Sequence, residues 1–241
     1  MGIFSNINAG EFLLRFMVFL KRSEMKKYKR RDFIALTAAG IGAATLPACN
    51  LENENEHIEE ADISSKAIAK DEIALNREMP RKLVMQLLDQ KVNKYMEISN
   101  NCAQSTFLAL KEQFGLEDGG IVKALTAMPG IAERGETCGT VSGSIMAIGL
   151  IYGRGEDRLN DFKAYRNSLI PAGKFCKLFE QEYGSTMCHE IQKSTYGRCY
   201  HLSDPDELAK FQEAGATEKC SAVVRAAVHI AANIILDNKN G

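Results

Sequence analysis

The apolar residues after residue 80 recur at the spacing of an α-helix. Between residues 81 and 96 they follow one another at intervals of three and four, as in Val84, Leu88 and Val92, which places them on one helical face. No segment shows the alternation of a strand. The predicted helices run from residue 81 to the Asn100–Asn101 pair, from that pair to Gly115, and over 120–128, 138–153, 157–183, 185–192, 206–214 and 217–236. The sequence therefore predicts an all-α fold, a helical bundle of about five to seven helices.

Residues with strong local preferences mark the predicted helix boundaries. Pro80 suits the first position of a helix, and Asn100 or Asn101 suits the cap of the next one. Gly184 is expected to end the long helix over 157–183, which Pro171 could bend. Residues 80–241 are thus predicted to form one domain of roughly 160 residues, which is long enough to bury its own core.

The N-terminal 48 residues have the pattern of an export signal. The segment Arg30-Arg31-Asp32-Phe33-Ile34 resembles a twin-arginine signal, an apolar run follows over residues 35–46, and Leu46-Pro47-Ala48-Cys49 resembles a lipobox. These motifs predict export of a folded protein to the periplasm or cell envelope, with Cys49 acylated and the protein anchored to the membrane. The alternative is a basic amphipathic helix on the mature protein.

Two further segments separate this signal from the rest of the chain. Residues 1–24 fit the signal poorly, and translation from Met25 would give a conventional one, so residues 1–24 are interpreted as a mis-assigned start. Residues 49–79 are rich in acidic residues and poor in large apolar ones, which predicts an acidic tether.

Charge argues against a nucleic-acid partner. Residues 1–48 hold eight basic and three acidic side chains, a net charge of +5, so the rest of the chain carries −6 of the total −1. Basic residues after residue 48 alternate with acidic ones along the predicted helical faces. No run approaches the roughly 20 apolar residues that span a bilayer.

Residues 129–143 concentrate glycines around one cysteine. Gly130, Gly135, Gly139 and Gly143 permit tight turns and close backbone approach, and Cys138 lies where an apolar helical run begins. Unpaired N–H groups at a helix start favour a thiolate, which suits a metal ligand or a reactive thiol. The alternative is that the glycines only let two helices pack closely, with Cys138 as apolar filler.

Four cysteines share one predicted position. Cys102, Cys138, Cys188 and Cys220 each fall in the first turn of a predicted helix. Four thiolates meeting at four helix starts would form a site for an iron–sulfur cluster or a zinc ion. Three disulfides among the six cysteines after Cys49 are the simpler expectation for an exported protein. Cys176 and Cys199 are candidates for a disulfide, a buried thiol or an auxiliary role.

The same segments resemble a known family. Asn101-Cys102-Ala103-Gln104, residues 135–143, Cys188-His189-Glu190 and Cys220 before an Ala/Val-rich helix resemble the C-GCAxxG-C-C family of putative redox-active proteins. Thr140 stands where the family usually has alanine. The resemblance implies a redox function and a domain similar to split-Soret cytochromes. Residues 185–189 lack the first cysteine of a C-x-x-C-H motif, so no covalent haem is expected.

Three functional hypotheses follow. In the first, Cys102, Cys138, Cys188 and Cys220 bind an iron–sulfur cluster that transfers electrons to a membrane or periplasmic redox partner. In the second, the same cysteines exchange thiols and disulfides, with Cys138 as the catalytic, attacking thiol. In the third, the protein is a disulfide-stapled lipoprotein that binds a transporter or another envelope partner without chemistry. The sequence leaves open whether the protein forms a homodimer.

Overall fold

A computed structural model of the chain describes residues 71–117 and 119–238. The predicted export signal, the lipidation residue Cys49 and most of the predicted tether lie outside these residues. Within them all regular elements are helical, and the one β-type pairing is an isolated bridge, so the predicted all-α fold is confirmed.

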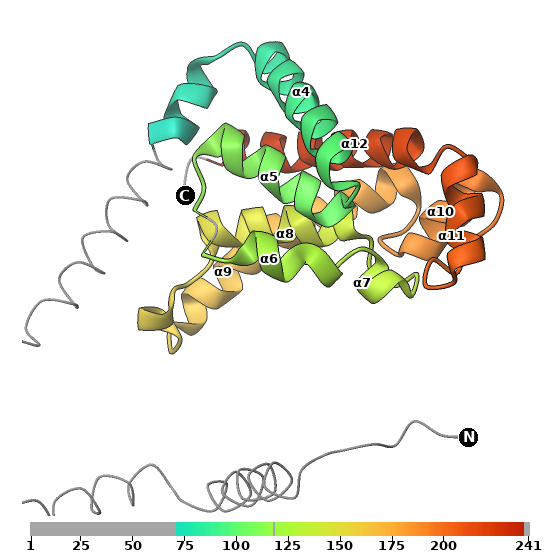
Figure 1. The fold of residues 1–241 in the computed structure, drawn as a ribbon. Coiled ribbons are helices and arrows are strands. Elements are labelled where there is room, and N and C mark those ends of the chain that lie inside the picture. Colours follow the sequence, from blue (N-terminus) through green and yellow to red (C-terminus); the bar gives the residue numbers. More distant parts are fainter. Residues whose placement is uncertain (1–70, 118, 239–241) are drawn as a thin grey trace, which may run out of the picture. The chain divides into compact units, whose positions relative to one another are not determined.

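The bundle is built from long helices joined by shorter ones (Figure 1). The long helices are α4 (Arg81–Ser99), α5 (Cys102–Phe114), α8 (Gly139–Tyr152), α9 (Phe162–Tyr183) and α12 (Ala216–Asp237). The shorter ones are α6 (Ile121–Ala124), α7 (Gly130–Glu133), α10 (Cys188–Tyr196), α11 (Pro205–Glu213) and the 3₁₀ turns η2 (Leu125–Ala127) and η3 (Glu156–Arg158).

Helix α12 forms the centre of the packing. It contacts α4, α5, α8 and α9, while α5 lies between α4 and α8. Small residues of α12 such as Ala227 and Ala231 are fully buried, as are Phe107 of α5 and Phe175 and Phe179 of α9. By length and composition α12 could also cross a membrane, but 56% of its most apolar window is buried inside the bundle. Burial of this apolar surface is the main stabilising term of the fold.

Most helix ends match the local signals in the sequence. The chain takes a positive φ at Gly115 and Gly184, where α5 and α9 were predicted to end. Helix α9 begins at Phe162 rather than at residue 157, because the side chain of Asp161 accepts a hydrogen bond from the Ala164 N–H and caps it there. Pro171 lies inside α9.

The packed structure begins before residue 80. Residues 71–78 are helical, and the side chains of Ile73 and Asn76 are buried. Asn76 Nδ2 donates to the carbonyl of Gln113 at 2.9 Å, and Gln113 Nε2 donates to Asn76 Oδ1 at 2.5 Å. These paired amides attach residues 71–78 to α5, so the last part of the predicted tether belongs to the folded domain.

Candidate functional site: four cysteines in one electrostatic group

Cys102 is the first residue of α5, and the residue before it fixes that position. Asn101 Oδ1 accepts a hydrogen bond from the Gln104 N–H at 3.0 Å, so the predicted asparagine cap is confirmed at the second of its two candidate residues. Asn101 Nδ2 donates to the carbonyl of Thr126 at 3.2 Å, and Gln104 Nε2 donates to that of Val122 at 2.9 Å. The start of α5 is therefore tied to the segment that leads into the glycine-rich loop.

A short backbone pairing brings two other cysteines together. Cys138 is the N-cap of α8 and Cys188 is the first residue of α10. Between the residues that precede them, Thr137 and Met187 form an antiparallel bridge. The N–H of Cys188 donates to the carbonyl of Glu136 at 2.7 Å. Two helix starts that are 50 residues apart in sequence are thereby held side by side.

Gly139 allows Cys102 to reach Cys138. A Cβ atom at Gly139 would lie 2.6 Å from Cys102 Sγ and 3.0 Å from the Cα of Pro129, closer than real side chains approach. With glycine there, Cys102 Sγ lies close enough to Cys138 that hydrogen bonding between the two thiols shifts the pKa of each. The glycine therefore makes the thiol contact possible.

Gly143 serves the packing of α8 against α5. A Cβ atom there would lie 2.4 Å from the Ala103 carbonyl oxygen and 3.0 Å from Thr106 Cβ. The expectation that Gly139 and Gly143 let two helices pack closely is thus confirmed. Cys138 is buried between these packed elements.

The contact shifts the pKa values of the two thiols in opposite directions. The hydrogen bond from Cys102 lowers the pKa of Cys138 to about 7, and the N–H groups of Thr140 and Val141 act in the same direction, although burial opposes them. Cys138 makes no regular cap hydrogen bond, so these are looser polar contacts at the helix start. The hydrogen bond to Cys138, together with burial and the charges of the other cysteines, raises the pKa of Cys102 well above its usual value. Cys102 therefore keeps its proton and donates a hydrogen bond to the Cys138 thiolate.

Cys188 and Cys220 belong to the same electrostatic group. Burial, followed by the charges of Cys138 and Cys220, raises the pKa of Cys188 to about 12, and a hydrogen bond from Gln192 offsets part of this. Burial also raises the pKa of Cys220 to about 11, against a hydrogen bond from Tyr196 and with a further rise from the charge of Cys138. One site thus combines an acidic thiol with three that resist ionisation.

The predicted position of Cys220 in its helix is wrong by two residues, about half a turn. Gly215 takes a φ of +83° and begins α12 at Ala216, before the predicted cap Thr217, so Cys220 is the fifth helical residue. The Thr217 hydroxyl contacts Asn100 Oδ1 at 3.4 Å instead of capping the helix. The helix start therefore stabilises a thiolate less at Cys220 than at Cys138.

The described residues do not form the predicted metal site as they are arranged. Within residues 71–117 and 119–238, no group of three or more Cys, His, Asp or Glu side chains is placed to hold a metal ion. A single zinc ion needs its sulfur ligands about 2.3 Å from one point, and the arrangement described here does not provide that. The iron–sulfur assignment of the four cysteines stays a prediction.

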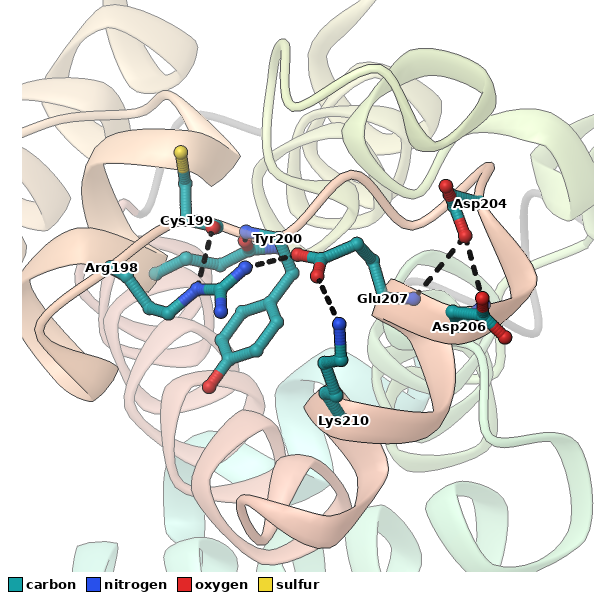
Figure 2. Close-up of polar contacts among 8 residues, drawn as sticks. Arg198, Cys199, Tyr200, Asp204, Asp206, Glu207 and Lys210 are labelled. Atoms are coloured by element: carbon teal, nitrogen blue, oxygen red, sulfur yellow. Dashed lines mark hydrogen bonds and ion pairs between the residues drawn. The ribbon is translucent and has the colours of Figure 1, made fainter.

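The other two cysteines lie apart from this group. All six described cysteines are free thiols, so none of the three expected disulfides is present among them. Cys176 is partly buried in α9, where burial raises its pKa. Cys199 is exposed, and its sulfur points away from the ion pair of Arg198 with Glu207 that attaches this loop to α11 (Figure 2).

His189 fastens the glycine-rich loop to α10. One ring nitrogen, Nδ1, lies 2.6 Å from the carbonyl oxygen of Gly135, and the His189 backbone N–H donates to the same oxygen at 2.9 Å. Because a carbonyl only accepts, Nδ1 carries the proton. The ring is half-exposed and Nε2 contacts Glu190 at 3.2 Å, so His189 has a structural role in the loop.

His229 lies apart from the cysteine group. It pairs with Asp89 at 2.8 Å on the surface between α12 and α4.

The loop itself contains a left-handed turn. Ile131, Ala132 and Glu133 have φ values of 47°, 56° and 63°, and the preceding Gly130 has 53°. The left-handed region costs roughly 1–2 kcal/mol per non-glycine residue. A Cβ atom at Gly130 would lie 3.5 Å from the Cβ of Cys188, so this strained segment covers one side of the cysteine group.

Two polar residues of the site were missed in the sequence. Gln192 Nε2 lies 3.6 Å from Cys188 Sγ, and the Tyr196 hydroxyl lies 3.7 Å from Cys220 Sγ. Cys188, Gln192 and Tyr196 are spaced four residues apart, which places them on one face of α10. That spacing was the available signal for both residues.

Comparison with known proteins gives one family match. A family model described as "Putative redox-active protein (C_GCAxxG_C_C)" matches residues 100–234. These bounds include all four cysteines of the group. No curated protein and no solved structure matches the chain.

Proposed function

The chain belongs to the C_GCAxxG_C_C family of putative redox-active proteins, and on this premise we propose that Cys102 and Cys138 form a redox pair that cycles between dithiol and disulfide. One observation carries the proposal: Cys102 Sγ lies against Gly139, the residue after Cys138, where hydrogen bonding with Cys102 lowers the Cys138 pKa to about 7. A thiolate is the attacking species in thiol–disulfide exchange, and its rate is best when its pKa is close to the ambient pH.

The proposed reaction transfers two electrons to a disulfide. The Cys138 thiolate attacks one sulfur of the substrate disulfide, forming a mixed disulfide and releasing the other sulfur as a thiolate. Cys102 then loses its proton to that leaving thiolate and attacks Cys138 Sγ. The Cys102–Cys138 bond forms, the mixed disulfide breaks, and the second substrate sulfur leaves as a thiolate that takes its proton from water.

The limited exposure of Cys102 and Cys138 restricts the size of the substrate. Cys138 is 6% exposed, while Cys102 and Cys188 beside it are partly exposed. A folded protein disulfide cannot reach a sulfur buried to this degree without opening the loop over residues 130–137. We therefore propose a small disulfide of the low-molecular-weight thiol class as the substrate.

Thiol counting under controlled redox conditions tests this proposal. The reduced full chain is equilibrated anaerobically with mixtures of reduced and oxidised dithiothreitol, and free thiols and disulfides are then mapped by mass spectrometry. We expect a reversible loss of two thiols with a bond between Cys102 and Cys138, absent in Cys138→Ser and retained in the control Cys176→Ser. A bond between other cysteines, or no loss of thiols, would contradict the proposal.

An iron–sulfur cluster on Cys102, Cys138, Cys188 and Cys220 is the second candidate. It is supported by the grouping of the four thiols, since the charges of neighbouring cysteines add to the larger effects of hydrogen bonding or burial in raising the pKa of Cys102, Cys188 and Cys220. Bound iron would supply one-electron transfer and would offset that charge. The described residues do not form a metal-holding group as arranged, which places this candidate second. Iron and inorganic sulfide analysis with an absorption spectrum, on protein purified without oxygen, separates the two candidates.

We also propose that the protein acts in the cell envelope. The support is the order of the twin-arginine-like segment, the apolar run and the lipobox ending at Cys49 in the sequence. In that location a membrane or periplasmic redox partner would renew the dithiol form. Fractionation of cells that express wild-type and Cys49→Ala protein tests the location, with membrane association expected only for the wild type.

A further inference from the structure

Helix α10 directs two polar side chains, Gln192 and Tyr196, at cysteine sulfurs. Gln192 and Tyr196 follow Cys188 by one and two helical turns, and each contacts a different sulfur of the group. Nothing in the redox chemistry proposed above uses either residue. Their common orientation on one helix face is the observation from which the following argument starts.

The orientation of the Gln192 amide is fixed by its second contact. Gln192 is 3% exposed, and its Oε1 accepts a hydrogen bond from the Tyr200 N–H at 2.8 Å. A backbone N–H can only donate, so oxygen must face Tyr200 and the NH₂ group must face Cys188. A buried amide N–H needs an acceptor, and neutral thiol sulfur is a weak one. The Gln192 N–H therefore favours an anionic sulfur at Cys188 over a neutral one, and it offsets part of the rise in the Cys188 pKa that burial causes.

Tyr196 is held toward Cys220 by its ring. The ring packs against Phe211 with centroids 5.2 Å apart and against Tyr200 at 5.9 Å, and Lys219 Nζ lies 4.5 Å from its centroid. These contacts leave the hydroxyl at Cys220 Sγ, at 3.7 Å. The phenol keeps its proton because burial raises the pKa of Tyr196, so toward an anionic sulfur it is the donor.

We propose that Gln192 and Tyr196 are positioning residues of the cysteine site, which stabilise electron-rich sulfur at Cys188 and Cys220 by donating hydrogen bonds to them. The inference rests on the redox function proposed above. In this role the side chains of α10 favour anionic sulfur at Cys188 and Cys220, as the N–H groups at the start of α8 do at Cys138.

Site-resolved alkylation tests the proposal. The reduced full chain is treated with iodoacetamide at one mildly alkaline pH until Cys188 and Cys220 of the wild type are labelled, and each rate is read by mass spectrometry. Tyr196→Phe keeps the ring and removes the donor, so labelling of Cys220 should slow about tenfold, the effect of losing one hydrogen bond to a charged group. Labelling of Cys188 should stay within about twofold.

A second variant tests the other donor. Gln192→Glu keeps an acceptor for the Tyr200 N–H and replaces the donor with a carboxylate, so labelling of Cys188 should slow about tenfold or more. Tyr200→Phe is the matched control, because it removes a hydroxyl from the same aromatic cluster without touching either sulfur contact. It should leave both rates within about twofold.

The direction in which the alkylation rates change shows whether Gln192 and Tyr196 position the sulfurs or only fill space. If Gln192 and Tyr196 only filled space, the variants would loosen the site and label the cysteines faster; an unchanged or faster rate overturns the proposal. The redox function is judged separately, by whether the wild type forms the Cys102–Cys138 disulfide. Loss of that disulfide with the labelling pattern intact would remove the function and leave the assignment of the donors.

Discussion

The two halves of the cysteine group are stabilised by different parts of the chain. In the half formed by Cys102 and Cys138, hydrogen bonding with Cys102 is the main cause of the lowered Cys138 pKa. Gly139 leaves room for Cys102 Sγ, and the backbone N–H groups at the start of α8 act in the same direction. In the half formed by Cys188 and Cys220, the donors are side chains of α10. The first half yields a thiolate near neutral pH and the second yields thiols, so buried cysteines a short distance apart acquire opposite character.

The largest effect is expected where α8 meets α5. Gly143→Ala places a Cβ atom 2.4 Å from the Ala103 carbonyl oxygen, a backbone atom that cannot rotate away. We expect a loss of about 3 kcal/mol in the free energy of unfolding, measured by urea denaturation followed by circular dichroism. The control is Gly149→Ala in the same helix, where a Cβ atom meets nothing within 4 Å. That control should gain about 1 kcal/mol, and a similar loss in both variants would contradict the packing role.

The next prediction separates stability from reactivity in the first half. Gly139→Ala displaces Cys102 Sγ, which can rotate, so the stability loss should be smaller, about 1–2 kcal/mol. The hydrogen bond to Cys138 is lost, and the Cys138 pKa should rise from about 7 toward its usual value. Alkylation of Cys138 at neutral pH should then fall about tenfold or more, while that of Cys188 is retained. An unchanged Cys138 rate would show that helix-start N–H groups alone acidify the thiol.

Cys138 of the first half should respond to pH in the opposite direction to Cys188 and Cys220 of the second. The folded pKa of Cys138, about 7, lies below its unfolded value of 9.0, so its contribution to stability is present above pH 9 and is lost as the pH falls through 7. The folded pKa values of Cys188 and Cys220, about 12 and 11, lie above 9.0, so their contribution is present below pH 9 and is lost as the pH rises through 11.

Unfolding titrations can resolve this difference. The stability difference between wild type and Cys138→Ser should grow from pH 6 to pH 9, and the loss of stability above pH 9 should be weaker in Cys220→Ser than in wild type. Cys176→Ser provides the control for removal of a thiol outside the group. Parallel pH curves for all four proteins would mean that the halves are not electrostatically distinct.

The smallest expected effect concerns the loop that lies over the second half. Ala132 has a φ of 56°, which glycine adopts without cost, so Ala132→Gly should stabilise the protein by about 1 kcal/mol. Ala209→Gly, at an exposed position in α11, should lose a similar amount because helical glycine is unfavourable. Differential scanning calorimetry would detect both changes as shifts of Tm in opposite directions. A loss in Ala132→Gly would argue against strain in the loop.

Local sequence signals predicted the helices and the neighbourhood of the cysteines. Asn101, Gly115 and Gly184 act through the two or three residues next to them, so their effects can be derived from sequence alone. The common position of cysteines near helix starts predicted that they would group together. It did not predict which two sulfurs meet, because that contact depends on how closely Gly139 lets α8 approach α5.

The wrong predictions concern features that depend on backbone conformation or on contacts between distant residues. The start of α12 was misplaced because Gly215 begins the helix through a positive φ, which leaves no side-chain signal. The left-handed turn at Ile131-Ala132-Glu133 could not be predicted, since these residues favour right-handed helices and only tertiary contacts hold them otherwise. Residues 71–78 were assigned to the tether because their contribution to the core lies in a few residues such as Ile73 and Asn76.

The bridge between Thr137 and Met187 also determines when during folding the acidic thiol arises. It joins positions 50 residues apart, and the intervening chain contains the whole of α8 and α9. Closing so long a segment costs entropy that only the docking of those helices can offset. A newly synthesised chain therefore carries exposed thiols with ordinary pKa values, and Cys138 acquires its lowered pKa only once the bundle has assembled.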